Sequence, residues 1–239
     1  MRAGLVVVAA FVAFLGWGDR SASSTVELAD DDLLIVNVAG PVTLRSSPAG
    51  DSGGATATAT ATATVSESWL WSRPEISASS NDGRGVLQVR CPGRGPCRAA
   101  LDVVVPAGAD VVVIAGAAVT VTRFDGSLTV LAADGPVALG PVSGSARVVS
   151  AGPIDGHGLL ASALDLSSSD DVALTFDTAP DSVVLAGANV RVEVPDDDYL
   201  VSATANGAVD SAVVSDDDAS SRLVLDASGD LVLSLAEDR

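Results

Sequence analysis

Lysine is absent from this 239-residue chain, whose 13 basic residues are all arginine and face 31 acidic residues, a formal net charge of −18. Such an acidic surface repels phosphate backbones and argues against nucleic acid as a partner. Aromatic residues are scarce at 3%, although hydrophobic residues make up 48%, so the apolar mass is mainly Ala, Val and Leu. Valine favours pleated surfaces, and 23 glycines and 11 prolines supply turns. The composition predicts an all-β chain of short strands.

Histidine and cysteine are nearly absent as well. The one histidine, His157, lies between two glycines, and no second histidine or nearby cysteine could share a metal with it. Cys91 and Cys97 bracket a Pro/Gly turn short enough to bring their Cα atoms within disulfide range. We predict a structural Cys91–Cys97 disulfide and hence an oxidising compartment, with two free thiols as the alternative.

The stretch GDSGG, residues 50–54, spells the nucleophile loop of trypsin-like serine proteases. That chemistry needs a histidine base, placed before the serine in those enzymes, and an aspartate that orients it. Here His157 follows Ser52 by about a hundred residues, and Ala55 stands where those enzymes have proline. We therefore interpret the motif as a turn whose match to the protease loop is a coincidence of a composition rich in Gly, Asp and Ser.

The first twenty residues form an apolar segment, from Ala3 to Gly18, that ends at Asp19-Arg20. Its length is between that of a signal-peptide core and that of a spanning helix. We predict that residues 1–20 are an uncleaved hydrophobic anchor helix, with a cleaved signal peptide as the alternative. The first predicts a single-pass protein of the cell membrane with its C-terminal domain outside; the second predicts secretion.

Residues 108–239 repeat a short strand, a small-residue corner and a second short strand, with a period of about 18 residues. A period this short fits one coil of a β-solenoid (β-helix-like), in which each coil covers the hydrophobic edge of the last. A β-sandwich with evenly spaced strands is the alternative. An apolar residue opens each second strand: Val119, Val137, Ile154, Val172, Val190, Val209 and Leu231.

The same pattern of strand, corner and strand occurs earlier in the chain, in LLIVNVAGPVTLRSS, residues 33–47. We interpret residues 24–107 as a β-rich N-terminal cap of the solenoid that carries the disulfide. Trp69 and Trp71 alternate onto one face of this section. Packing in the core of the cap is one role for them, and a stacking platform for a sugar ligand is the other.

Several stretches resemble the DUF4097-type β-strand-repeat proteins, also known as an adhesin domain family. They are WSRPE, CPGRGPC, VVVPAGADVVV, the segment with Pro195 and Tyr199, and ASGDLVLSL near the C-terminus. The family's Ser/Ala-Gly-Asp corner survives at Ser228-Gly229-Asp230, and other corners read AGP, SDD or AGAN. The resemblance implies a structural or adhesive role and carries no chemistry with it.

Two further residue groups are candidate sites. The aspartate runs 30–32, 196–198 and 216–218 fit no calcium-loop pattern, and we interpret them as solvated turns. Arg123 and Asp125, with Arg147 about one coil further, are the nearest approach to the charged groups of a polysaccharide-cleaving β-helix.

The sequence thus predicts an exported, membrane-anchored, adhesin-like β-solenoid that is not an enzyme. We assign no catalytic, cofactor-binding or metal-binding residue and expect no cofactor. The expected partners are the membrane, through the N-terminal segment, and an unknown component of the cell envelope or surface. The alternative is a carbohydrate-binding or carbohydrate-active β-helix that contacts its ligand through Trp69 and Trp71. A subunit of an envelope sensor is a third interpretation.

Overall fold

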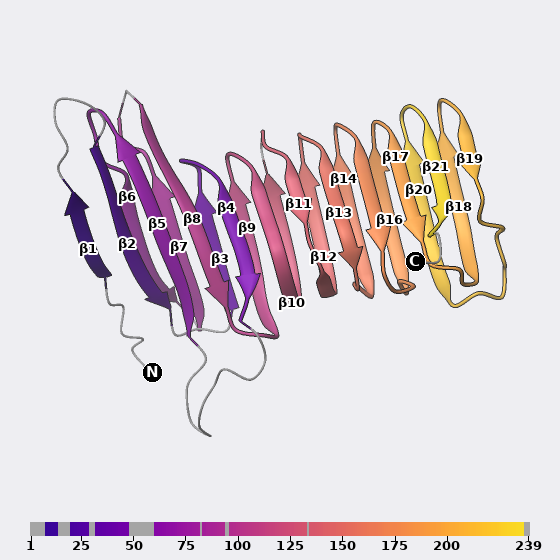
Figure 1. Cartoon of the computed structure of the whole chain (residues 1–239), viewed down its shortest axis with the longest axis horizontal. Helices are drawn as coiled ribbons and strands as arrows, with labels where there is room; N and C mark the ends of the chain where they lie inside the picture. Colours follow the sequence, from indigo (N-terminus) through magenta and orange to yellow (C-terminus); the bar gives the residue numbers. More distant parts are fainter. Residues whose placement is uncertain are drawn as a thin grey trace, which may run out of the picture.

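The computed structural model describes residues 8–13, 20–28, 32–47, 60–81, 83–93, 96–132 and 134–236, and this part of the chain contains strands and turns but no helix. The strands stack along one long axis as two facing layers (Figure 1). We call the layers sheet A and sheet B. The predicted all-β, solenoid-like architecture is therefore present.

The strands fall into the two sheets as follows, in spatial order from the N-terminal end. Sheet A contains β1 (Val8–Ala13), β2 (Arg20–Leu28), β5 (Ala61–Trp69), β8 (Cys97–Val105), β4 (Val42–Ser46), the first part of β10 (Val119–Ala132), β11 (Val137–Leu139), β13 (Ile154–Leu159), β15 (Val172–Phe176), β17 (Val190–Val194), β21 (Leu231–Leu235) and β19 (Val209–Ser211). Sheet B contains β6 (Glu75–Asn81), β7 (Arg84–Arg90), β3 (Asp32–Asn37), β9 (Ala109–Ala115), the second part of β10, β12 (Val142–Ser150), β14 (Ala163–Ser168), β16 (Ser182–Gly187), β20 (Ser221–Ala227) and β18 (Tyr199–Ala205).

Each coil runs along one strand of sheet B, turns a corner, and returns along one strand of sheet A. Side chains alternate, so every second residue points between the sheets, as Val172, Leu174 and Phe176 do in β15. The apolar residues that open the sheet-A strands stack directly on one another: Val42, Val119, Val137, Ile154, Val172, Val190, Leu231 and Val209. The predicted ladder is confirmed, and all of its members are buried except the last.

The order of the coils in space differs from their order in sequence at both ends. The β3–β4 coil lies between β7–β8 and β9–β10, since β3 pairs with β7 and β9 and β4 pairs with β8 and β10. The β20–β21 coil likewise lies between β16–β17 and β18–β19. Val190 therefore contacts Leu231, and Val209, at the outer edge, is 51% exposed.

Hydrogen bonds between corners hold the last coils in this order. Asn189 donates to Asp171 Oδ1 from its backbone (3.2 Å) and from its side chain (2.8 Å). The Asn189 side-chain oxygen in turn accepts from the backbone of Asp230 at 3.0 Å, and Asp230 Oδ1 accepts from Ala208 at 2.9 Å. These hydrogen bonds between corners thus follow the order of the coils in space and not their order in the sequence.

The N-terminal end is antiparallel, and it corrects the prediction for the first twenty residues. Val8–Ala13 forms β1, which pairs antiparallel with β2 from Val8 opposite Val26 to Ala13 opposite Ser21. An apolar run rich in valine fits a strand as well as a helix, and β2 supplies the partner that makes the strand preferable. The predicted anchor helix is therefore wrong. Within the described ranges no helix is long and apolar enough to span a bilayer, so the expected single-pass location in the cell membrane is not supported.

Candidate functional site

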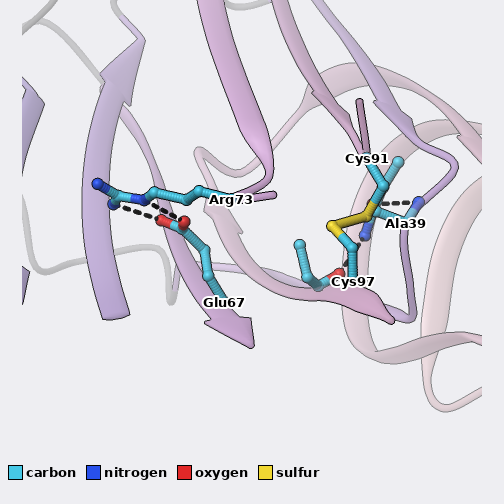
Figure 2. The surroundings of a disulfide bond; sticks show 7 residues. Ala39, Glu67, Arg73, Cys91 and Cys97 are labelled. Carbon is cyan, nitrogen blue, oxygen red and sulfur yellow. Dashed lines mark hydrogen bonds and ion pairs between the residues drawn. A yellow bond between two sulfur atoms is a disulfide. The ribbon is translucent and has the colours of Figure 1, made fainter. Parts of the chain in front are cut away.

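The corner between β7 and β8 carries the disulfide. Cys91 and Cys97 are bonded, with their Cα atoms 5.9 Å apart (Figure 2). The connection from β7 in sheet B to β8 in sheet A is six residues long. The corresponding connection between β12 and β13 has only three residues, Ala151–Pro153. The disulfide fixes this longer corner beside Ala39, in the corner of the neighbouring coil, whose carbonyl accepts from the backbone N–H of Ala99 at 3.2 Å.

The two tryptophans proposed as ligand contacts have different surroundings. Trp69, the last residue of β5, is buried, with the Arg73 guanidinium 5.4 Å from the centre of its ring. Trp71 is 74% exposed, next to the half-exposed Leu70. Any ligand that stacks on a tryptophan in this section would therefore reach Trp71 and not Trp69.

Arg73 also forms the one ion pair that reaches into the interior of this end, among the residues that the structure describes. Its Nε and Nη2 donate to the two carboxylate oxygens of Glu67 at 2.7 and 2.9 Å (Figure 2). The Glu67 side chain is fully buried and also accepts from Ser24 at 3.3 Å. The hydrogen bonds to Glu67 raise the pKa of Arg73 above its ordinary value. This charge is paired and hydrogen-bonded, as a structural buried carboxylate must be.

The three residues considered as a cleavage centre separate into two places. Arg123 and Asp125 line one small hollow of about 120 Å³, at the turn from sheet A to sheet B. Arg147 lies elsewhere, on the outside of sheet B, where its Nε is 3.4 Å from Asp165. It borders a wider hollow of about 360 Å³ along β10, β12, β14 and β16. The structure does not bring the three together.

The other motifs noted in the sequence, His157, GDSGG and the first aspartate run, form no site with one another. His157 is exposed on β13, 3.0 Å from Asp155 and 3.1 Å from the Thr175 hydroxyl. The GDSGG motif lies outside the described residues, as do Asp30 and Asp31 of the first aspartate run. Among the residues that are described, no three His, Cys, Asp or Glu side chains gather as a metal site would require.

The outer surface of sheet B carries a feature that the sequence analysis missed. On neighbouring strands β3, β9, β10 and β12, Val36, Ile114, Leu131 and Val149 stand side by side and point outward. A second row lies alongside, with Leu34 between Val86 on β7 and Val112 on β9. Leu131 is 40% and Val149 41% exposed. We call these seven residues the apolar face: Leu34, Val36, Val86, Val112, Ile114, Leu131 and Val149.

The opposite side of the solenoid is polar in the same coils. The outward positions of β4 and β10 in sheet A include Thr43, Arg45 and Thr120, and the neighbouring β8 carries Asp102 and one apolar residue, Val104. The contrast shows that the apolar face is a property of one side and not of the composition. A signal was present in the sequence, because DLLIVN and ADVVVIA are apolar at consecutive positions and not at alternate ones.

Comparison with known proteins shows no family for this chain. No family model matches the chain, and no curated protein matches it. A solved structure named "putative adhesin" from Bacteroides fragilis is 13% identical with a TM-score of 0.45, covering 90% of this chain and 97% of its own. Another "putative adhesin", from Parabacteroides merdae, is 9% identical with a TM-score of 0.44, covering 91% and 96%.

A third, named "putative cell adhesion protein" from Clostridium sporogenes, is 11% identical with a TM-score of 0.35, covering 97% of this chain and all of its own. A further solved structure, named "putative lipid binding protein" from Parabacteroides distasonis, is 11% identical with a TM-score of 0.40, covering 90% of this chain and 97% of its own. The DUF4097 resemblance remains a resemblance. These similarities say nothing of a ligand or a role for this chain.

Proposed function

We propose that this protein is a non-catalytic, adhesin-like interaction scaffold, whose binding surface is the apolar face of sheet B. The observation that carries the proposal is the unbroken row Val36, Ile114, Leu131 and Val149, which faces outward across four neighbouring strands, with Val36 and Ile114 half-buried and Leu131 and Val149 exposed. Contiguous apolar patches on a soluble surface mark sites of interaction. The chain's net charge of −18 favours solubility and opposes non-specific association, so contact is directed to the uncharged apolar face.

The solenoid supplies the rigidity that such a surface needs. Each strand of the apolar face is hydrogen-bonded to a neighbour on both sides, and the residues between the exposed ones, such as Ile35, Val113 and Val130, are buried in the core. Neighbouring strands are about 4.8 Å apart, so the outward side chains form a fixed lattice. A preorganised surface loses little conformational freedom when it binds.

The N-terminal section has a supporting role in this proposal. We assign residues 24–107 to a cap at one end of the solenoid, in which the Glu67–Arg73 pair and the disulfide each tie two segments together. Terminal capping sections keep solenoids soluble. The disulfide favours function in an oxidising compartment.

A direct comparison of two faces tests the proposal. Immobilised full-length protein would be probed with cell-envelope fractions and a glycan array, beside the variants Leu131→Asp on the apolar face and Thr120→Asp on the sheet-A part of the same strand. We expect Leu131→Asp to abolish binding and Thr120→Asp to keep it. Equal binding by both variants would contradict the proposal.

Carbohydrate binding is the second candidate, because the 74% exposed Trp71 offers an indole on which a sugar could stack. On this alternative, Trp71→Ala abolishes binding on the glycan array and Leu131→Asp leaves it intact. Tryptophan fluorescence should then change when the bound glycan is added to the wild type.

A further inference from the structure

We infer that the apolar face pairs with the same face of a second copy of this chain, in a two-fold dimer whose strands run in reversed order across the interface. The inference rests on the proposed function, since it names the partner of that surface. It would make the interaction homotypic, because each of the two copies is the binding partner of the other.

The face has the form that sheet-on-sheet packing requires. Its seven side chains come from five neighbouring strands. The three other outward positions in the same two rows are Gln88, Thr129 and Arg147, of which only Arg147, on the outermost strand β12, is charged. Two such surfaces pack face to face at about 10 Å, with their side chains interdigitated. A two-fold contact uses the same patch on both partners and closes after two copies.

Charges at the two ends of the face specify the direction of pairing. At the β12 end, the Arg147 side chain is 67% exposed and its Nε is 3.4 Å from Asp165. At the β3–β9 end, Asp32 and Asp110 lie directly opposite each other on neighbouring strands. Asp32 is paired with Arg84 at 3.0 Å, and Asp110 makes no ion pair with the residues that the structure describes. The β12 edge thus offers an exposed guanidinium, and β9 offers a carboxylate, Asp110, without a counterion among the described residues.

A two-fold axis parallel to the strands, between β9 and β10, brings these ends together. It lays β12 of one copy over β3 of the other. The stem of Arg147 then lies over Leu34 of the partner subunit, its guanidinium extends along the strands towards Asp110 of the partner subunit, and symmetry repeats the contact. The same axis sets Leu131 over Ile114 of the partner subunit, and Val149 over Val36 of the partner subunit. A partner whose surface is rich in charge of one sign fits less well, because its charges would lie against the uncharged middle of the apolar face.

The salt dependence separates this partner from a basic one. Two copies that each carry −18 repel one another at long range, and added salt screens that repulsion beyond about 8–10 Å. The apolar contact is not weakened by the same salt. Dimerisation should therefore strengthen as salt is added, whereas binding of a cationic partner would weaken.

Sedimentation of the full-length protein over a concentration series, at low and high salt, is the first test. We expect the weight-average mass to rise from 23.7 kDa towards twice that value, and to do so at lower concentration in high salt. Leu131→Asp should remain monomeric with an unchanged circular dichroism spectrum, and Thr120→Asp should dimerise like the wild type. A wild type that stays monomeric in every condition overturns the inference.

Cross-linking of introduced thiols tests the direction of the pairing. A mixture of Val149→Cys and Val36→Cys chains should form a disulfide-linked dimer, whereas Val149→Cys alone should not. A dimer that forms with Val149→Cys alone means that like strands face each other, and this would overturn the reversed order. Failure of the dimer leaves the binding assay of the previous section untouched, so the two proposals fail separately.

Discussion

Alkaline titration tests the C-terminal end of the solenoid through one residue, because the chain has a single tyrosine and no lysine. Tyr199 opens β18, is fully buried, and donates its hydroxyl to the Pro195 carbonyl at 3.1 Å. Burial, and then the negative charges of Asp197 and Asp196, raise the pKa of Tyr199 from 10.0 to about 12. The folded protein therefore holds the neutral phenol more strongly than the unfolded chain does.

The sign of the effect follows from this raised pKa. Below pH 10 the phenol is protonated in both states, and its contribution to stability is fully present. From pH 10 to about 12 the unfolded chain loses the proton while the folded one keeps it. The free energy of unfolding then falls by about 1.4 kcal/mol per pH unit, or about 2–3 kcal/mol over the window. Bonded cysteines do not titrate and arginine stays charged, so no other side chain obscures the change.

The assay is urea unfolding at a series of pH values on either side of 10, with tyrosinate absorbance followed in the folded protein. Tyr199→Phe removes the titrating hydroxyl and should have a flat stability profile over the same window. The reasoning would be refuted if the wild type were also flat there, or if the tyrosine of the folded protein titrated at its ordinary pKa of 10.0.

Three further changes test the interior. Val172→Asp places an unpaired charge in the stack of buried apolar residues and should lower the free energy of unfolding, measured by urea titration, by about 4 kcal/mol. The control, Ala173→Asp, faces outward and should lower it by under about 1 kcal/mol. Similar losses in the two variants would mean that the register is wrong. Arg73→Ala leaves the buried Glu67 carboxylate without its counterion and should cost about 2 kcal/mol, most of it recovered by adding Glu67→Gln; no recovery would contradict a charge effect. Reducing the disulfide should cost about 2 kcal/mol, as expected for a six-residue separation, and reactive thiols in the native, unreduced protein would disprove the bond.

The repeat could be predicted from the sequence because one physical rule generates it. Stacking requires an apolar residue at the same place in every coil, so Val137, Ile154 and Val172 are recognisable from their regular spacing along the chain. The order of the last coils could not be predicted in the same way. Both the coil of residues 200–220 and that of 221–239 satisfy the rule, and the choice depends on corner hydrogen bonds at Asn189 and Asp230.

The errors of prediction have a common cause in valine-rich runs. Such a run does not say whether it is a helix or a strand, and residues 8–13 form a strand because β2 offers a partner for it. It also does not say which of its residues face outward. Val112 and Ile114 therefore resemble part of an ordinary strand, although they lie between core residues and form the apolar face. Register with the neighbouring strands supplies this information, and a single sequence does not contain it.

The central claim is that the apolar face is the surface through which this protein binds. Hydroxyl-radical footprinting of its side chains, in the free and the bound or dimeric states, tests that claim whichever partner is present. We predict that labelling falls at Leu131 and Val149 and stays unchanged at Val184 and Val209, which are equally or more exposed but lie outside the face. Unchanged labelling at Leu131 and Val149 upon binding, with protection elsewhere, would contradict the account.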